Sequence, residues 1–295
     1  MTLTMGKHEL ELGGPYLGML REANGLLHDP AALHARMEED GYLLLRGLHD
    51  RAKVEAARRS ILEGLDANAQ LDQSRPLDEG VAEEGGRGAF LGGSRAFTRA
   101  EPFLNVVESP EIMGFFARFL RADVLTYDYK WLRVVGPGSF TGAHYDIVYM
   151  GRGTQNVYTA WTPLGDVPLE MGPLAVLVGS HRFERVRETY GRMDVDRDHV
   201  TGWFTNDPVE MVERFGGQWQ TGEFRMGDVL IFGMYTMHGS LNNGTNRYRI
   251  SCDTRYQRAH EPVDERWIGE NPIAHYAWME GETVPIEEAR KKWGV

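Results

Sequence analysis

His144 and Asp146, separated by one residue, carry side chains that bind metal ions. The surrounding residues 143–149 are rich in Ile, Val and Tyr, a composition that predicts a β-strand. Side chains at positions i and i+2 of a strand point to the same face, so an imidazole nitrogen and a carboxylate oxygen can approach one ion together. The triplet is not specific by itself, because a paired His and Asp on a sheet surface has the same spacing.

A third candidate ligand, His238, follows much later, after the apolar run 228–233. Two histidines and one carboxylate form the facial triad of non-haem Fe(II) sites, which leaves coordination positions open. Two open positions can take a chelating 2-oxo acid, and the third can take O₂. The three residues therefore predict the Fe(II) site of an oxygenase.

Arg249 is a candidate for binding the carboxylate of such an acid. It follows His238 across residues 241–246, which contain Asn-Asn-Gly and predict a tight turn. The turn is either a hairpin or a corner between two sheets, and in both cases Arg249 returns beside the metal. A guanidinium can then bind a carboxylate in bidentate fashion, and the Ser251 hydroxyl lies on the same face. Arg247 and Arg255 are expected to be surface charges.

Composition limits the class of partner. The chain has 295 residues and a formal net charge of −11, which argues against a nucleic-acid surface. Its only cysteine is Cys252, so an intramolecular disulfide is impossible, and the apolar runs are too short to cross a membrane. We expect a cytoplasmic protein with a small-molecule substrate, no nucleic-acid partner and no membrane contact; the oligomeric state is not indicated.

The first part of the chain, residues 1–123, is predicted to be helical with one strand at 42–45. Asp29, Asp50 and Ser109 stand where helix N-caps are expected, and a proline follows two of them. Residues 67–96 are rich in Gly, Asp, Glu and Ser, which predicts a long loop and a candidate lid.

From residue 124 short runs of β-forming residues alternate with glycine turns, the pattern of an antiparallel jelly roll. We expect one domain over 1–295, mainly β with flanking helices, whose core spans 124–257. An insertion at 182–226 interrupts the core, and a tail at 258–295 packs over it. The predicted strands are 124–135, 143–149, 157–164, 174–178, 228–233 and 247–257.

These segments, in this order, resemble the phytanoyl-CoA dioxygenase family of Fe(II)/2-oxoglutarate oxygenases. The resemblance implies a double-stranded β-helix (a cupin-like jelly roll) with iron at one mouth, and a reaction that converts 2-oxoglutarate and O₂ to succinate and CO₂ while hydroxylating a substrate. It also implies that Ser240 and Arg249 hold the distal carboxylate of 2-oxoglutarate, with Trp161 and Thr159 lining the same pocket. The motifs are His144-Tyr145-Asp146, the segments 160–164 and 172–181, and His238-Gly239-Ser240 with Arg249-Ile250-Ser251.

The substrate is not indicated by the sequence. Arg133, Tyr145 and Arg152 are candidate substrate contacts, and Arg87 and Arg95 are further candidate anion contacts. Many family members have Gln where Tyr145 stands, and strand alternation points Tyr145 away from the metal. Two alternative functions stay open: a non-redox cupin-like metal protein, such as an isomerase or small-molecule binder, and an inactive scaffold. Arg249 with Ser240 favours the oxygenase, because the alternatives have no use for them beside a metal.

Overall fold

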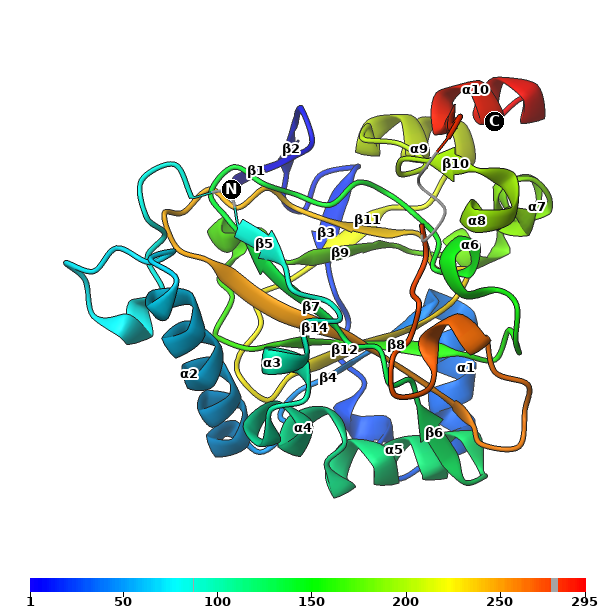
Figure 1. Ribbon diagram of the computed structural model, residues 1–295. Helices are drawn as coiled ribbons and strands as arrows, with labels where there is room; N and C mark the ends of the chain where they lie inside the picture. Colours follow the sequence, from blue (N-terminus) through cyan, green and yellow to red (C-terminus); the bar gives the residue numbers. More distant parts are fainter. Residues whose placement is uncertain (87, 277–280) are drawn as a thin grey trace.

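Two β-sheets lie one above the other in the computed structural model, which describes residues 1–86, 88–276 and 281–295 (Figure 1). The larger sheet has the strand order β4-β12-β8-β14-β7-β5, with β6 also paired to β14. All its pairs are antiparallel. Its strands are β4 (Tyr42–Leu45), β5 (Gly88–Phe90), β6 (Val124–Thr126), β7 (Trp131–Val135), β8 (Tyr158–Pro163), β12 (Val229–Gly233) and β14 (Arg249–Arg258).

The smaller sheet has the order β13-β9-β11-β3. The chain passes between the sheets at residues 241–248, so the turn that follows His238 is a corner between sheets and not a hairpin. The buried Asn243 fixes this corner by donating to the carbonyl oxygens of Val135 and Arg247 at 3.1 and 2.7 Å. The strands are β3 (Leu17–Met19), β9 (Leu174–Leu177), β11 (Trp219–Thr221) and β13 (His238–Ser240).

Helices of the N-terminal part cover the outer face of the larger sheet (Figure 1). The predicted caps are in place, since Asp29, Asp50 and Ser109 each accept a backbone N–H of the first helical turn. Apolar side chains of these helices pack on the outward side chains of β14, with Tyr256 stacked on Phe116 at 4.2 Å. The helices are α1 (Pro30–Asp40), α2 (Arg51–Ala67), α4 (Glu101–Val107) and α5 (Pro110–Leu120).

Strand β14 is buried on both faces and alternates sharply in polarity. Its outward residues include Ile250, Cys252 and Tyr256, which contact the helices. Its inward residues are all polar and all buried: Arg249, Ser251, Asp253, Arg255 and Gln257. Buried polar groups need partners or a ligand, so this row marks the interior of the barrel as a functional surface.

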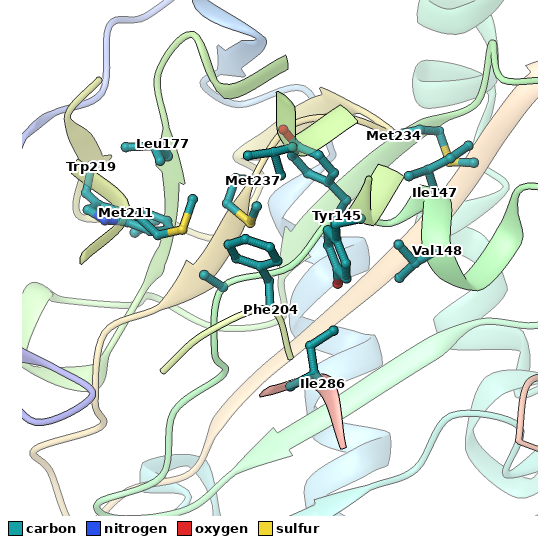
Figure 2. Close-up of a cluster of buried hydrophobic side chains, with 14 of the residues drawn as sticks. Tyr145, Ile147, Val148, Leu177, Phe204, Met211, Trp219, Met234, Met237 and Ile286 are labelled. Atoms are coloured by element: carbon teal, nitrogen blue, oxygen red, sulfur yellow. The ribbon is translucent and has the colours of Figure 1, made fainter. Parts of the chain in front are cut away.

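The insertion and the C-terminal segment form a third layer, whose apolar side chains pack against the smaller sheet (Figure 2). Side chains from the insertion and from the C-terminal segment, including Phe204, Met211 and Ile286, join Tyr145, Leu177 and Trp219 in one apolar cluster. Strand β10 of the insertion pairs in parallel with β15 of the tail. The elements are α7 (Glu184–Glu188), α8 (Val195–Asp198), β10 (Val200–Thr201), α9 (Pro208–Phe215), β15 (Val284–Pro285) and α10 (Ile286–Trp293).

The mainly β jelly roll with flanking helices is confirmed, while several local predictions are wrong. Residues 143–149 do not form a strand: the chain makes isolated bridges at Ala143 and His144 and turns into a short helix, α6 (Ile147–Met150). Residues 67–96 are not a structureless loop, because they contain the 3₁₀ turn Leu77–Glu79, strand β5 and the start of α3 (Arg95–Thr98).

Further elements were not predicted at the two ends of the chain. They are β1 (Thr2–Met5), β2 (His8–Glu11) and β3 at the N-terminus, and β15 and α10 near the C-terminus. The remaining short elements are 3₁₀ turns at Asn24–Leu26, Leu169–Met171, Ser180–Arg182, Tyr190–Arg192 and Glu265–Trp267. In the part of the chain that the structure describes, no helix combines the length and apolarity needed to span a bilayer.

Candidate metal centre

The three predicted ligands come together inside the barrel. One potential ligand atom from each of His144, Asp146 and His238 lies within 4.8 Å of the others, and all three residues are buried. His144 and His238 are joined by two backbone hydrogen bonds of 3.0 and 3.1 Å, which places their side chains next to each other. Asp146 reaches the site from the residue that precedes α6, so a turn and not a strand supplies the i+2 geometry.

Backbone carbonyls set the tautomers of both histidines. The Nδ1 atom of His144 lies 2.9 Å from the Gly142 carbonyl oxygen, and Nδ1 of His238 lies 3.0 Å from that of Thr236. Since a carbonyl only accepts, Nδ1 carries the proton and Nε2 is left as a free ligand. Burial, reinforced by His238, lowers the pKa of His144 to about 3, and burial also lowers the pKa of His238. Both rings are therefore neutral near pH 7, as metal binding requires.

Two side chains hold the carboxylate of Asp146. The Thr159 hydroxyl donates to Oδ2, and Nη2 of Arg255 lies 3.0 Å from both carboxylate oxygens. Burial would raise the pKa of Asp146, but Arg255 and the two histidines outweigh it and hold the pKa well below its usual range. Asp146 is thus an anion ready for a cation. Partners of this kind orient metal-binding side chains.

The expectation that Arg255 is a surface charge is wrong. This residue is 1% exposed, and its guanidinium lies 4.1 Å from the centre of the Trp131 ring. Strand alternation from Arg249 was the signal that could have found it, because positions 249 and 255 share a face. Arg247, by contrast, is exposed as expected.

The predicted co-substrate residues border the same interior. Buried polar atoms of these residues have no hydrogen-bond partner among the described residues: Nε of Arg249, Oγ of Ser251 and Nε1 of Trp161. The Arg249 guanidinium lies 6.0 Å from the Trp161 ring and donates to the Gly172 carbonyl oxygen. Burial, and then Arg133, lower its pKa to about 10, so it stays charged at neutral pH. A buried cation with unused donors beside it suits a carboxylate ligand.

Two other predicted co-substrate residues have partners already. The Ser240 Oγ accepts the Thr141 N–H at 2.9 Å, which leaves its own proton to donate. The Thr159 hydroxyl donates to Asp146, a different role from the co-substrate contact expected for it.

The three candidate substrate contacts are separated in space. Arg133 lines the metal cavity. Tyr145 points away from it, as alternation predicted, and its hydroxyl donates to the Ser180 carbonyl at 2.6 Å. Arg152 lies in a different groove, where it pairs with Asp194 at 2.7 Å. Arg95 pairs with Asn271 at 2.9 Å, and Arg87 lies outside the described residues.

A cavity of about 330 Å³ opens onto His144 and Asp146. The barrel contributes Trp131, Arg133 and Arg255, and α6 with its N-terminal turn contributes Tyr149 and Met150. Three peripheral segments complete the wall: β5 with Phe90, the insertion with Gly202 and Trp203, and the tail with His275 and Tyr276.

The tail is fixed in place by ionic and aromatic contacts. Arg266 pairs with Asp264 at 2.6 Å and also contacts Asp194 and Asp196 of the insertion. Trp267 packs on Trp131 with ring centres 4.7 Å apart. These contacts hold the tail against the barrel, where it forms part of the cavity wall.

Solved structures share this architecture. SnoK, a non-haem α-ketoglutarate-dependent carbocyclase from nogalamycin biosynthesis, superposes with a TM-score of 0.58 at 18% identity, covering 90% of this chain and 95% of its own. EctD from S. alaskensis, solved with 2-oxoglutarate and 5-hydroxyectoine, gives 0.56 at 20% identity over 91% and 95%. At these identities the likeness establishes the jelly-roll fold.

Curated relatives are closer in sequence. The 1-deoxypentalenic acid 11-beta-hydroxylase of Streptomyces exfoliatus is 27% identical over 258 residues, which cover 79% of this chain and 83% of the relative. The enzyme of the same name from Streptomyces arenae is 26% identical with the same coverage. Fold, site and relatives together define a non-haem Fe(II)- and 2-oxoglutarate-dependent hydroxylase.

A sequence profile assigns the chain to a particular family within this class. The sequence profile described as Phytanoyl-CoA dioxygenase (PhyH) matches residues 37–251, and the chain belongs to this family. Membership confirms the resemblance and decides against the non-redox cupin-like alternative and the inactive scaffold.

Proposed function

We propose that His144, Asp146 and His238 hold Fe(II), and that the interior beside them binds 2-oxoglutarate through Arg249. The convergence of three buried ligand atoms within 4.8 Å is the observation that carries this proposal. Ser251 and Trp161 supply unused donors at the same end of the barrel, and Ser240 retains a free hydroxyl proton. With Fe(II), 2-oxoglutarate and O₂ bound, the centre supplies an oxidation that releases succinate and CO₂ and adds a hydroxyl to the substrate.

The chain's own residues position the reactants and exclude water. Thr159 and Arg255 restrain Asp146, and the backbone carbonyls of residues 142 and 236 restrain the two imidazoles. The corner at Asn243 returns β14 so that Arg249 faces the interior. Aromatic walls enclose the cavity and limit access of water to the reacting carbon.

The substrate in this proposal is a small apolar molecule with a ring system. The cavity of about 330 Å³ is at the small end of ligand sites, which span about 300–1,000 Å³. Five aromatic residues line it, so it suits an apolar body. The curated relatives, named as 11-beta-hydroxylases of 1-deoxypentalenic acid, support hydroxylation as the outcome. A cytoplasmic location also remains a proposal, consistent with a single, buried, free Cys252.

Succinate release tests the function directly. The Fe(II)-loaded protein is screened with 2-oxoglutarate against a library of alicyclic and aromatic compounds that includes 1-deoxypentalenic acid. We expect at least one compound to stimulate succinate release and to gain one oxygen atom by mass spectrometry. Asp146→Ala should lose Fe(II) binding and all succinate release while its circular dichroism is retained. Stoichiometric iron in that variant would contradict the assigned ligands.

A further inference from the structure

Arg133 presents part of its guanidinium to the metal cavity. It lies on β7, opposite Ser251 of β14, and its Nε donates to Asp253 at 2.6 Å. The side chain remains 27% exposed, whereas Asp253 is 7% exposed. The ring of Phe90 lies 5.3 Å from the guanidinium carbon. One edge of the guanidinium is therefore fixed, and the described residues offer no hydrogen-bond partner to the Nη edge.

The other two interior arginines are less accessible. Arg255 donates from Nη2 to Asp146, and its Nε and Nη1 are buried without a partner among the described residues. Arg249 is fully buried at the co-substrate end, where it contacts Gly172 and Trp161. Arg133 is thus the arginine that combines a rigid anchor with accessible donors in the cavity wall.

The charged side chains that the barrel strands and the metal-binding turn place around the cavity include one more cation than anions. Arg133, Arg249 and Arg255 are opposed by Asp146 and Asp253, so three positive groups face two negative ones. A divalent metal and the dianion of 2-oxoglutarate cancel each other and do not change this balance. Of the described residues that line the cavity, Asp146 alone carries a carboxylate. A net positive charge favours a monoanionic ligand in the cavity, and the Nη edge of Arg133 offers it accessible donors.

Apart from Arg133, Thr141, the metal-ligand side, Arg255 and His275, the wall is made of aromatic residues, Met150 and Gly202, and part of the mouth is exposed. Phe90 and Trp203, at 51% and 37%, are among the few exposed large hydrophobic residues of the described chain, and both belong to the cavity. A ligand that satisfies both features has one anionic group and an apolar body.

We infer that the Nη edge of Arg133 binds a carboxylate of the substrate, and that the substrate is an apolar monocarboxylic acid. This inference rests on the proposed function, because it concerns the same cavity. Arg133 is then the residue that recognises the substrate, and the reaction is the hydroxylation already proposed.

Two ligands of nearly the same shape, one an anion and the other neutral, test this inference. Cyclohexanecarboxylate and cyclohexanecarboxamide are titrated calorimetrically into the nickel-loaded protein saturated with 2-oxoglutarate, in the wild type, Arg133→Gln and Arg133→Lys. Arg152→Gln is the matched control, since it removes the same charge from a different groove. We expect the wild type and the control to prefer the acid by about tenfold or more, the value of one charged hydrogen bond.

Arg133→Gln should lose this preference and keep its affinity for 2-oxoglutarate within about twofold. Arg133→Lys, which can still pair with Asp253, should keep a reduced preference for the acid, so a folding defect in the Gln variant does not decide the result. Two results would overturn this inference and leave the proposed function standing. One is equal affinity of the wild type for the acid and the amide, and the other is no binding of the acid while 2-oxoglutarate still binds. A fall in 2-oxoglutarate affinity that matches the loss of acid binding would also overturn it, because Arg133 would then serve the co-substrate. Failure of every protein to bind 2-oxoglutarate would overturn the proposed function and this inference with it.

Discussion

Arg255→Gln should destabilise the metal-free protein strongly and the metal-loaded protein much less. In the metal-free state the guanidinium is the only full positive charge in hydrogen-bond contact with Asp146 among the described residues, with both side chains about 3% exposed or less. Removing one partner of such a pair leaves a buried, unpaired carboxylate, which costs about 3–5 kcal/mol. A bound divalent ion supplies a second cation to the same carboxylate, so the loss then shrinks.

The free energy of unfolding by urea, measured in EDTA and in saturating Ni(II), checks this magnitude. In EDTA the loss corresponds to a fall in Tm on the order of 10 °C for a chain of this size. The Asp146→Asn background is the internal control: without the charge, Arg255→Gln should cost below about 1 kcal/mol. Arg247→Gln, a change of the same kind on the exposed part of the turn, should have little effect in either condition.

Equal losses in the wild-type and Asp146→Asn backgrounds would refute the reasoning, because the cost would then come from packing against Trp131 and not from charge. A loss that stays the same in Ni(II) would refute it as well.

Three further predictions concern the site and its surroundings. Arg249→Ala should weaken 2-oxoglutarate binding by about 2–5 kcal/mol, roughly 30-fold or more, and spare metal binding; Arg247→Ala should change neither, and unchanged calorimetry for Arg249→Ala would remove the assignment. Between pH 7.5 and 5 the metal-free protein should lose stability, because burial lowers the pKa of His144 to about 3 and of His49 to about 4. Unfolded histidine takes up a proton near pH 6.5 while these two stay neutral in the fold, so acid favours unfolding by about 2 kcal/mol per residue at pH 5; urea titrations at four pH values in EDTA check the slope, and a stability that is flat or rises on acidification would contradict it. Amide exchange of the described residues in 72–95 should slow when a confirmed substrate joins the metal and 2-oxoglutarate, with the change centred on β5 because Phe90 lines the cavity; identical exchange with and without substrate would mean a fixed connection and no lid.

The metal site could be predicted from sequence because its signals are local and chemical. His144 and Asp146 are two residues apart, and a single corner joins His238 to Arg249, so chain connectivity keeps each pair in the same part of the barrel. The strand assigned to 143–149 was nevertheless wrong, because a short apolar run does not distinguish a strand from a helical turn. The predicted proximity of His144 and Asp146 still holds, since a bridge followed by a turn also brings positions i and i+2 together.

Arg255 and the cavity walls could not be predicted in the same way. The sequence predicts a surface position for Arg255, because polar residues on a strand often face solvent. In this fold helices cover one face of β14 and the barrel encloses the other, so both faces are buried. Trp203 and Tyr276 reach the cavity through contacts between segments far apart in sequence, such as the β10–β15 pair, and no local pattern records such pairing.

The cavity is built from two sets of segments that are separate in the sequence. Metal and co-substrate positions lie on strands β8, β13 and β14 and the turn before α6, whereas Phe90, Trp203 and Tyr276 come from the edge strand β5, the insertion and the tail, which carry none of those positions. Segments of this kind tolerate exchange because the scaffold does not depend on their length. The fold is consequently open to redesign by transplantation: exchanging β5, the 202–203 turn or the 275–276 segment between relatives should redirect substrate choice while the oxidising centre is inherited intact.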